Sequence, residues 1–102
     1  MSELYKKRIR FTAHLAQLID FIGRQAGYTV ALAPDGLKHM PHSLHYLGLA
    51  ADLNIYRDGV YLRETADYQF AGYFWRSLDE DCVWGGDFGD GNHFSISFRG
   101  RK

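Results

Sequence analysis

The sequence contains one cysteine and two prolines, and its 102 residues carry no net charge. The single thiol, Cys82, excludes an intramolecular disulfide and is compatible with a reducing compartment. Its acidic neighbours, Glu80 and Asp81, would not lower the pKa of the thiol. We therefore expect Cys82 to be a packed core residue and not a nucleophile.

The absence of a charge excess also limits the partners of the chain. Twelve basic and twelve acidic residues cancel, whereas nucleic-acid-binding domains usually show a basic excess, so we expect no nucleic-acid partner. No apolar run approaches the ~20 residues of a membrane span, so we expect no stable membrane insertion. The first six residues lack the apolar core of a secretion signal. The length predicts a single domain over residues 1–102, which we expect to be a monomer.

The chain has many aromatic residues. In two segments the apolar residues recur with the period of an α-helix. Apolar side chains at three- and four-residue steps predict an amphipathic helix over residues 4–25, with Gly27 as its C-cap. Because four of the residues 6–10 are basic and oppose the helix dipole, we expect this end of the helix to be solvent exposed. A second helix is predicted from Thr65, as its N-cap, to Leu78. The acidic residues 79–81 are expected in a solvated loop.

Strand-type patterns lie on both sides of the second helix. Residues 28–33 are apolar and β-branched, residues 49–56 and 93–98 alternate, and residues 60–62 follow a hairpin turn at 57–59. A turn at 34–36 and a loop at 37–43 are predicted between the first two strands. The sequence thus predicts an α+β fold, with a small antiparallel sheet packed against two main helices.

Metal-ligand residue types stand on the polar sides of the two alternating strands. Asp52 and His93 point away from the apolar side chains of their strands, and His45 lies in the preceding loop. A catalytic zinc site takes about three protein ligands of these types and keeps one position open for water. Asp90 lies three residues before His93, across Gly91 and Asn92, so its carboxylate can reach the bound water as a general base.

From spacing alone, a structural interpretation of the same residues remains open. Asp52 is also a suitable turn or capping carboxylate, His45 a loop residue and His93 a strand-edge histidine. His14, alone in the first helix, is assigned no role. Asp87 is a second carboxylate near the site, for which we favour a structural role.

The two motifs together resemble a known family. Ser43-x-His-x-x-Gly-x-Ala-x-Asp52, followed by Trp84-Gly-Gly-Asp-Phe88 and Asp90-x-x-His-Phe94, is similar to the zinc peptidases that include D-alanyl-D-alanine carboxypeptidases, vancomycin-resistance dipeptidases and phage L-alanyl-D-glutamate endolysins. The short phage endolysins look most similar, and the resemblance runs from about residue 7 to 97. It implies the hedgehog/DD-peptidase fold.

The resemblance also implies a chemistry. His45, Asp52 and His93 would hold Zn2+, and Asp90 would take the proton of the attacking water and pass it to the leaving amine. The expected substrate is the stem peptide of peptidoglycan, cut between L-Ala and D-Glu. Such an endolysin, with no separate cell-wall-binding domain, would accumulate in the bacterial host cytoplasm and reach the wall after membrane permeabilisation.

One segment departs from the family pattern. Family members usually carry an arginine, in an Arg-[Ser/Thr]-x-x-x-Gln type motif, between the first strand and the first zinc histidine. Here the corresponding segment, residues 31–42, is shorter than in the family and contains no arginine. It does contain Lys38, His39 and His42. Two alternatives therefore stand beside the endolysin hypothesis: a D,D-carboxypeptidase or dipeptidase of the same family, and a non-catalytic zinc-containing module that binds wall peptides or belongs to a phage particle.

Overall fold

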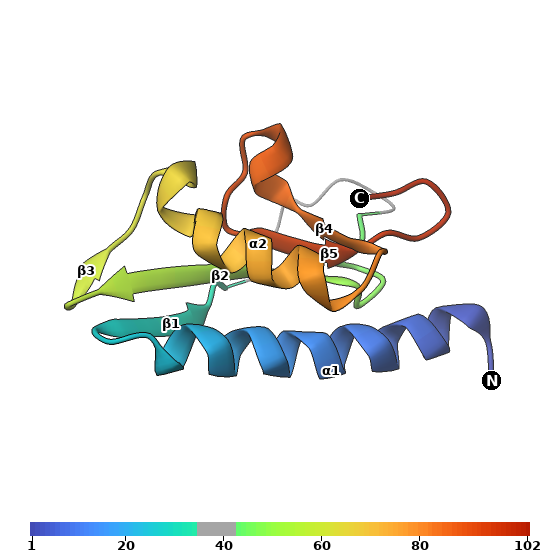
Figure 1. Cartoon of the computed structure of the whole chain (residues 1–102). Helices are drawn as coiled ribbons and strands as arrows, with labels where there is room; N and C mark the ends of the chain where they lie inside the picture. The colour runs from blue at the N-terminus through green and yellow to red at the C-terminus, as the bar shows by residue number, and fades with distance from the viewer. Residues whose placement is uncertain (35–42) are drawn as a thin grey trace.

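The computed structural model describes residues 1–34 and 43–102, which form an α+β fold with two helices and a small antiparallel sheet (Figure 1). This architecture confirms the fold class predicted from the sequence. The predicted turn and loop around Lys38, His39 and His42 lie outside the described residues.

The long first helix, α1, spans Glu3–Arg24 and begins with Ser2 as its N-cap. The C-cap is Gln25, so the prediction of Gly27 at this position is wrong. The Gln25 side chain donates a hydrogen bond to the carbonyl of Phe21 (3.0 Å) and so satisfies one of the free carbonyls of the last turn. Gly27, with φ +83°, instead serves the turn into the first strand.

Of the basic residues near the start of α1, Lys6 is exposed as expected, whereas Lys7 and Arg10 make contacts that the expected solvent exposure did not include. Lys7 Nζ donates to the carbonyl of Ser97 (2.6 Å) and lies 3.3 Å from the Asp81 carboxylate. Arg10 forms an ion pair with Asp79, whose side chain is only 12% exposed. Asp79 and Asp81 are therefore partners of α1, and only Glu80 of the acidic segment is exposed as the predicted solvated loop would require.

The sheet has the order β1-β2-β5-β4 and is antiparallel throughout, with β3 paired to the far end of β2. The strands are β1 (Tyr28–Leu32), β2 (Ala50–Arg57), β3 (Val60–Tyr61), β4 (Cys82–Trp84) and β5 (His93–Ile96). β4 was not predicted, because three residues are too few to show a period. β5 ends two residues earlier than the predicted strand. β2 lies between β1 and β5, and this central position places Asp52 inside the sheet.

The second helix, α2, spans Gln69–Leu78 and follows a 3-10 helix, η1, at Thr65–Tyr68. Thr65 is therefore not the N-cap of α2, as the sequence pattern predicted, and no side-chain cap bond forms there. The Tyr68 hydroxyl donates to the carbonyl of Leu62 (2.8 Å) and accepts a hydrogen bond from the N–H of Ile55 (3.1 Å). These bonds attach Tyr68, the last residue of η1, to β2 and to the chain that follows β3.

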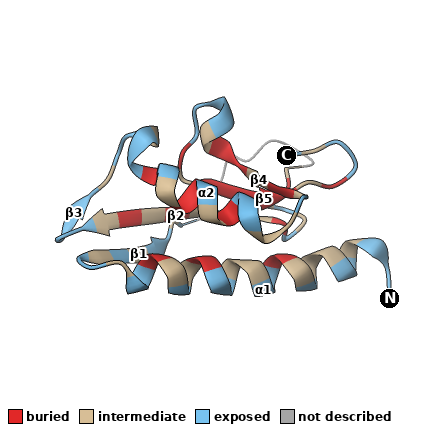
Figure 2. Ribbon diagram, viewed as in Figure 1, coloured by how far each residue is buried: buried red, intermediate tan, exposed pale blue. Residues whose placement is uncertain are grey.

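Aromatic contacts join the two helices to each other and to the sheet. The rings of Phe21 in α1 and Phe74 in α2 stack with centroids 4.0 Å apart, and Trp75 meets Phe11 of α1 and Phe94 of β5 edge to face. Figure 2 shows the buried residues on the inner sides of the helices and along β5 and β4. Within the described ranges, no helix is long and apolar enough to span a membrane.

Candidate metal centre

His45 lies in a turn that is fixed between two buried leucines. Leu44 and Leu49 are almost inaccessible to solvent, and the Leu49 N–H donates to the Leu44 carbonyl (2.9 Å), which closes the turn. The Ser43 hydroxyl accepts a hydrogen bond from the N–H of His45 (3.2 Å). Gly48 has φ +74°, a conformation that favours glycine, and it directs the chain into β2. The serine and glycine of the motif thus shape the turn that presents His45.

Arg8 of α1 supports this turn from outside. Its Nε donates a hydrogen bond to the carbonyl of Leu47 (2.6 Å). A Cβ atom on Gly48 would lie 3.3 Å from the same Nε, so glycine also gives the arginine room to approach. The turn is therefore attached to α1 as well as to β2.

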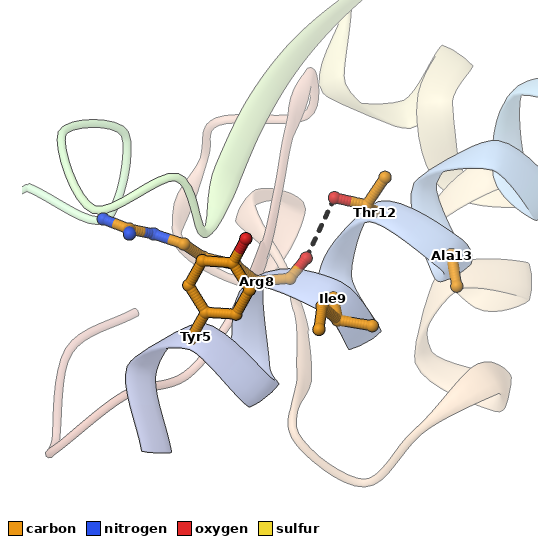
Figure 3. Close-up of a pocket in the computed structure, with 5 residues that line it drawn as sticks. All are labelled: Tyr5, Arg8, Ile9, Thr12 and Ala13. Atoms are coloured by element: carbon orange, nitrogen blue, oxygen red, sulfur yellow. Dashed lines mark hydrogen bonds between the residues drawn. The ribbon is translucent and has the colours of Figure 1, made fainter. Parts of the chain in front are cut away.

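The side of α1 next to Arg8 bears an open hollow of about 410 Å³, which is lined by Tyr5, Arg8, Ile9, Thr12 and Ala13 (Figure 3). The Thr12 hydroxyl is occupied by a hydrogen bond to the carbonyl of Arg8 (2.9 Å). None of the predicted ligands lines this hollow. Its size alone therefore gives no link to the metal-ligand residues.

Asp52 and His93 are direct partners in the sheet. The register of β2 and β5 pairs Asp52 with His93, and directly opposed residues in an antiparallel pair place their side chains on the same face, with Cβ atoms roughly 4.5–5.5 Å apart. The two strands that carry the predicted ligands are thus direct neighbours in the sheet. The pairing brings together two ligand types that are far apart in the sequence.

The structure gathers all three predicted ligands into one cluster. His45 Nε2 and His93 Nδ1 each lie 3.5 Å from Asp52 Oδ1, and one ligand atom from each residue falls within 4.8 Å of the others. Two ligand atoms that share a tetrahedral ion at ~2.1 Å are about 3.4 Å apart, so the two separations from Asp52 Oδ1 match those expected around a common metal ion. The side chains are 7%, 28% and 11% exposed for His45, Asp52 and His93, which leaves Asp52 as the most accessible of the three.

A hydrogen bond at Nε2 orients the ring of His93. Its Nε2 lies 2.9 Å from the carbonyl oxygen of Lys102, which also accepts a hydrogen bond from the Ser95 hydroxyl (2.8 Å). Because a carbonyl only accepts, Nε2 carries the proton and donates, and in the neutral ring Nδ1 then offers its lone pair on the Asp52 side. Lys102 and Ser95 were not identified from the sequence, since a backbone carbonyl leaves no signal there.

The electrostatics of His93 follow from the same contacts. Burial alone would lower the pKa of His93, but the hydrogen bonds to Asp52 and to the Lys102 carbonyl, with the negative charge of Asp52, raise the pKa above its ordinary value. The charge of Asp90 acts in the same direction. The surroundings of His93 therefore stabilise a positive charge, either a proton on the imidazole ring or a bound cation.

Asp90, the predicted base, lies beside the cluster but is not one of its members. It is exposed, and it lies in the glycine-rich segment 85–92, which begins with the 3-10 helix Gly85–Phe88. The Asp90 N–H donates to the Gly85 carbonyl (2.8 Å), and the Asp90 carbonyl accepts from the His93 N–H (3.1 Å). The competing carboxylate, Asp87, forms an ion pair with Arg76 at 3.2 Å.

Glycine is required at the start of this segment. A Cβ atom on Gly85 would lie 2.2 Å from the Asp90 carbonyl oxygen and 2.6 Å from the His93 Cβ, so any side chain would displace both residues. A Cβ on Gly86 would collide with the Trp84 indole, which donates a hydrogen bond to the Gly91 carbonyl (2.7 Å). The Trp-Gly-Gly sequence thus packs the loop that carries Asp90 tightly against β5.

Cys82 takes no part in the site. It is buried in β4, and burial raises the pKa of its thiol to about 12, which confirms the expected core role.

No protein-family model matches the chain, and no curated protein matches its sequence. A functional proposal therefore depends on the chemistry of the cluster and on the motifs that build it.

Proposed function

We propose that the chain is a zinc-dependent hydrolase of peptidoglycan stem peptides, a phage or prophage endolysin of the hedgehog/DD-peptidase fold that cuts the bond between L-Ala and D-Glu. One observation carries this proposal. His45, Asp52 and His93 offer ligand atoms within 4.8 Å of one another, and the loop three residues before His93 carries an exposed carboxylate, Asp90. The motif resemblance supplies the reaction and the substrate class.

The donor set supports zinc as the metal. Two imidazoles and one carboxylate are common ligands of catalytic zinc, and three protein ligands leave a position for water or substrate. The Lys102 carbonyl and Ser95 support His93 in the way that outer hydrogen bonds usually hold a zinc histidine. Bound zinc would lower the pKa of a water ligand and polarise the scissile carbonyl.

The residues of the chain then have separate roles. His45, Asp52 and His93 hold the ion, and the partial exposure of Asp52 leaves the cluster accessible from one side. Asp90 accepts a proton from the attacking water and transfers it to the leaving amine. Its exposed position beside the cluster allows the carboxylate to meet a bound peptide. Gly85 fixes the backbone that carries Asp90 next to His93.

The test combines metal analysis with product analysis on one preparation. Purified protein should contain about one zinc ion per chain, clear sacculi in a zymogram and lose clearing in the presence of a chelator. Mass spectrometry of the digested muropeptides should show separation of L-Ala from D-Glu. Chelator-insensitive clearing, or a protein that binds no zinc, would contradict the proposal.

The same mass spectra test the alternative activity within the family. A D,D-carboxypeptidase or dipeptidase would release terminal D-Ala, and this product has a different mass. It requires the same cluster and the same base, so the geometry around His93 does not favour either bond.

A non-catalytic zinc module is supported by a separate observation. Residues 31–42 contain no arginine, and the Asp90 carboxylate lies outside the ligand cluster. A module of this kind would bind zinc stoichiometrically and bind wall peptides without turnover. Measurable peptide binding combined with intact muropeptides after long incubation would favour it over the enzyme.

A further inference from the structure

A small polar hollow of about 180 Å³ lies beside Asp90. Two segments that are distant in sequence line it. Residues 61–68 contribute Tyr61, Arg63 and Thr65, and the glycine-rich loop contributes Asp90 and Asn92. No metal ligand lines the hollow, so it is a separate feature that adjoins the predicted base.

Close backbone contacts build this hollow. A Cβ atom on Gly91 would lie 2.7 Å from the Cα of Thr65, so glycine allows the loop to pack directly on η1. The carbonyl of Asn92 accepts a hydrogen bond from the N–H of Leu53 in β2 (2.9 Å). The opposite wall is fixed by Tyr68, which hydrogen-bonds to the backbone of Leu62 and of β2. Both walls are thus held by the sheet that carries Asp52.

The charge of the hollow comes from two side chains. Among the lining residues, all within the described part of the chain, Arg63 is the only basic one and Asp90 the only acidic one. The Arg63 guanidinium lies over the ring of Tyr61, 5.8 Å from its centroid, and the residue is exposed. A guanidinium presents paired N–H donors that match a carboxylate. The hydroxyl of Thr65 and the amide of Asn92 add neutral hydrogen-bonding groups.

We propose that this hollow is the subsite for the amino acid that leaves with the amine, and that Arg63 binds its α-carboxylate. The inference rests on the proposed function, in which Asp90 returns a proton to the leaving nitrogen. The leaving residue must then lie on the Asp90 side of the cluster. In a γ-linked D-Glu, and equally in a terminal D-Ala, the carbon that bears this nitrogen also bears a free carboxylate. Arg63 is the lining group that can neutralise it next to Asp90.

The test uses two stem peptides that differ at one group. One contains D-Glu with a free α-carboxylate, and the other contains the α-carboxamide, D-isoglutamine. The unaltered protein should cleave the carboxylate peptide with a kcat/KM about tenfold higher, mainly through KM. Arg63→Gln should remove this preference, and Arg63→Lys should retain part of it. Arg57→Gln is the matched control, because Arg57 lies over the ring of Tyr28 and does not line the hollow.

The outcomes separate this inference from the proposed function. If the protein cleaves both peptides and Arg63→Gln keeps the tenfold preference, the subsite is wrong and the hydrolase proposal stands. If it releases terminal D-Ala, the same comparison applies to D-Ala-D-Ala peptides with a free or amidated C-terminus.

If nothing is cleaved, the hydrolase proposal fails, and binding of the product-like peptide γ-D-Glu-L-Lys decides the subsite. Amide NMR shifts at Thr65 and Asn92 that require both the α-carboxylate and Arg63 would support it. Equal shifts with the α-amidated peptide, or in Arg63→Gln, would overturn it.

Discussion

Asp79, at the C-terminal end of α2, should make the stability of the fold depend on pH in the acid range. Its side chain is 12% exposed, and burial alone would raise its pKa. The N–H of Asp81, the Arg10 guanidinium and the His14 ring all bind the carboxylate, and together they lower the pKa of Asp79 from 3.8 to about 2. This difference corresponds to about 2 kcal/mol of folding free energy at pH 7. Asp79→Asn should therefore lower the free energy of unfolding by about that amount.

The sign follows from the lowered pKa in the folded state. The stabilisation is complete above about pH 4 and is lost as the pH falls towards 2, with about half of it remaining at pH 3. Urea unfolding followed by tryptophan fluorescence, at pH 7 and pH 3 with chelator present, measures the difference between Asp79→Asn and the unaltered protein. Chelator removes any contribution from metal binding.

Asp20→Asn is the matched control for this experiment. Asp20 also pairs with an arginine of α1, Arg24, at 2.7 Å, but its side chain is 63% exposed, so its loss should change stability by less than about 0.5 kcal/mol at either pH. A difference between Asp79→Asn and the unaltered protein that is the same at pH 7 and pH 3 would refute the reasoning, because the stabilisation would then not come from the ionised carboxylate.

Three further predictions concern the site. Asp90→Asn should retain zinc but reduce clearing of sacculi at least about a hundredfold, whereas Asp87→Asn, on the same loop, should keep both zinc and clearing activity. Metal analysis measures the zinc content, and turbidity measures the clearing. A fully active Asp90→Asn would exclude Asp90 as the base. Zinc at a hundred times its Kd should raise the free energy of unfolding by about 2.7 kcal/mol and Tm by roughly 10 °C in calorimetry. His93→Ala should abolish this shift, and a shift that survived would place the metal elsewhere. Gly85→Ala should lower stability by more than about 2 kcal/mol and weaken zinc binding, because its Cβ would collide with Asp90 and His93. Gly23→Ala, where nothing lies within 4 Å inside α1, should be neutral or stabilise by up to about 1 kcal/mol; equal losses in the two glycine variants in urea unfolding would refute the packing argument.

Local periodicity was enough to predict most of the fold. The predicted helix at 4–25 matches Glu3–Arg24, and the alternation at 49–56 matches Ala50–Arg57, because both segments are long and bury one face. The errors in prediction concern short elements and helix termini. β4 has three residues, and the segment before α2 is a 3-10 helix whose Tyr68 hydroxyl bonds to Leu62 and Ile55. Such tertiary bonds leave no periodic pattern.

The candidate ligands could be predicted from the sequence, but the residues that hold them in position could not. Alternation placed Asp52 and His93 on the polar sides of their strands, and the register between β2 and β5 then made them direct partners. The hydrogen bond from His93 to Lys102 depends on the turn after β5, where Phe98 pairs with Arg101 and returns the chain to the strand. Ser95, whose hydroxyl donates to the same Lys102 oxygen, is fully buried.

The position of His45 shows why a ligand motif alone does not define a site. Six residues separate it from Asp52, and neither a helix nor a strand gives this spacing a fixed geometry. The turn that carries His45 is held by Arg8, a residue of the basic segment for which only solvent exposure was expected. Arg8 in turn depends on the placement of α1, which Lys7 and Arg10 fix through the acidic residues at 79–81. The ion pairs around Asp79 therefore support the candidate site as well as stability, because they attach the helix whose Arg8 holds the turn of His45, the first candidate ligand.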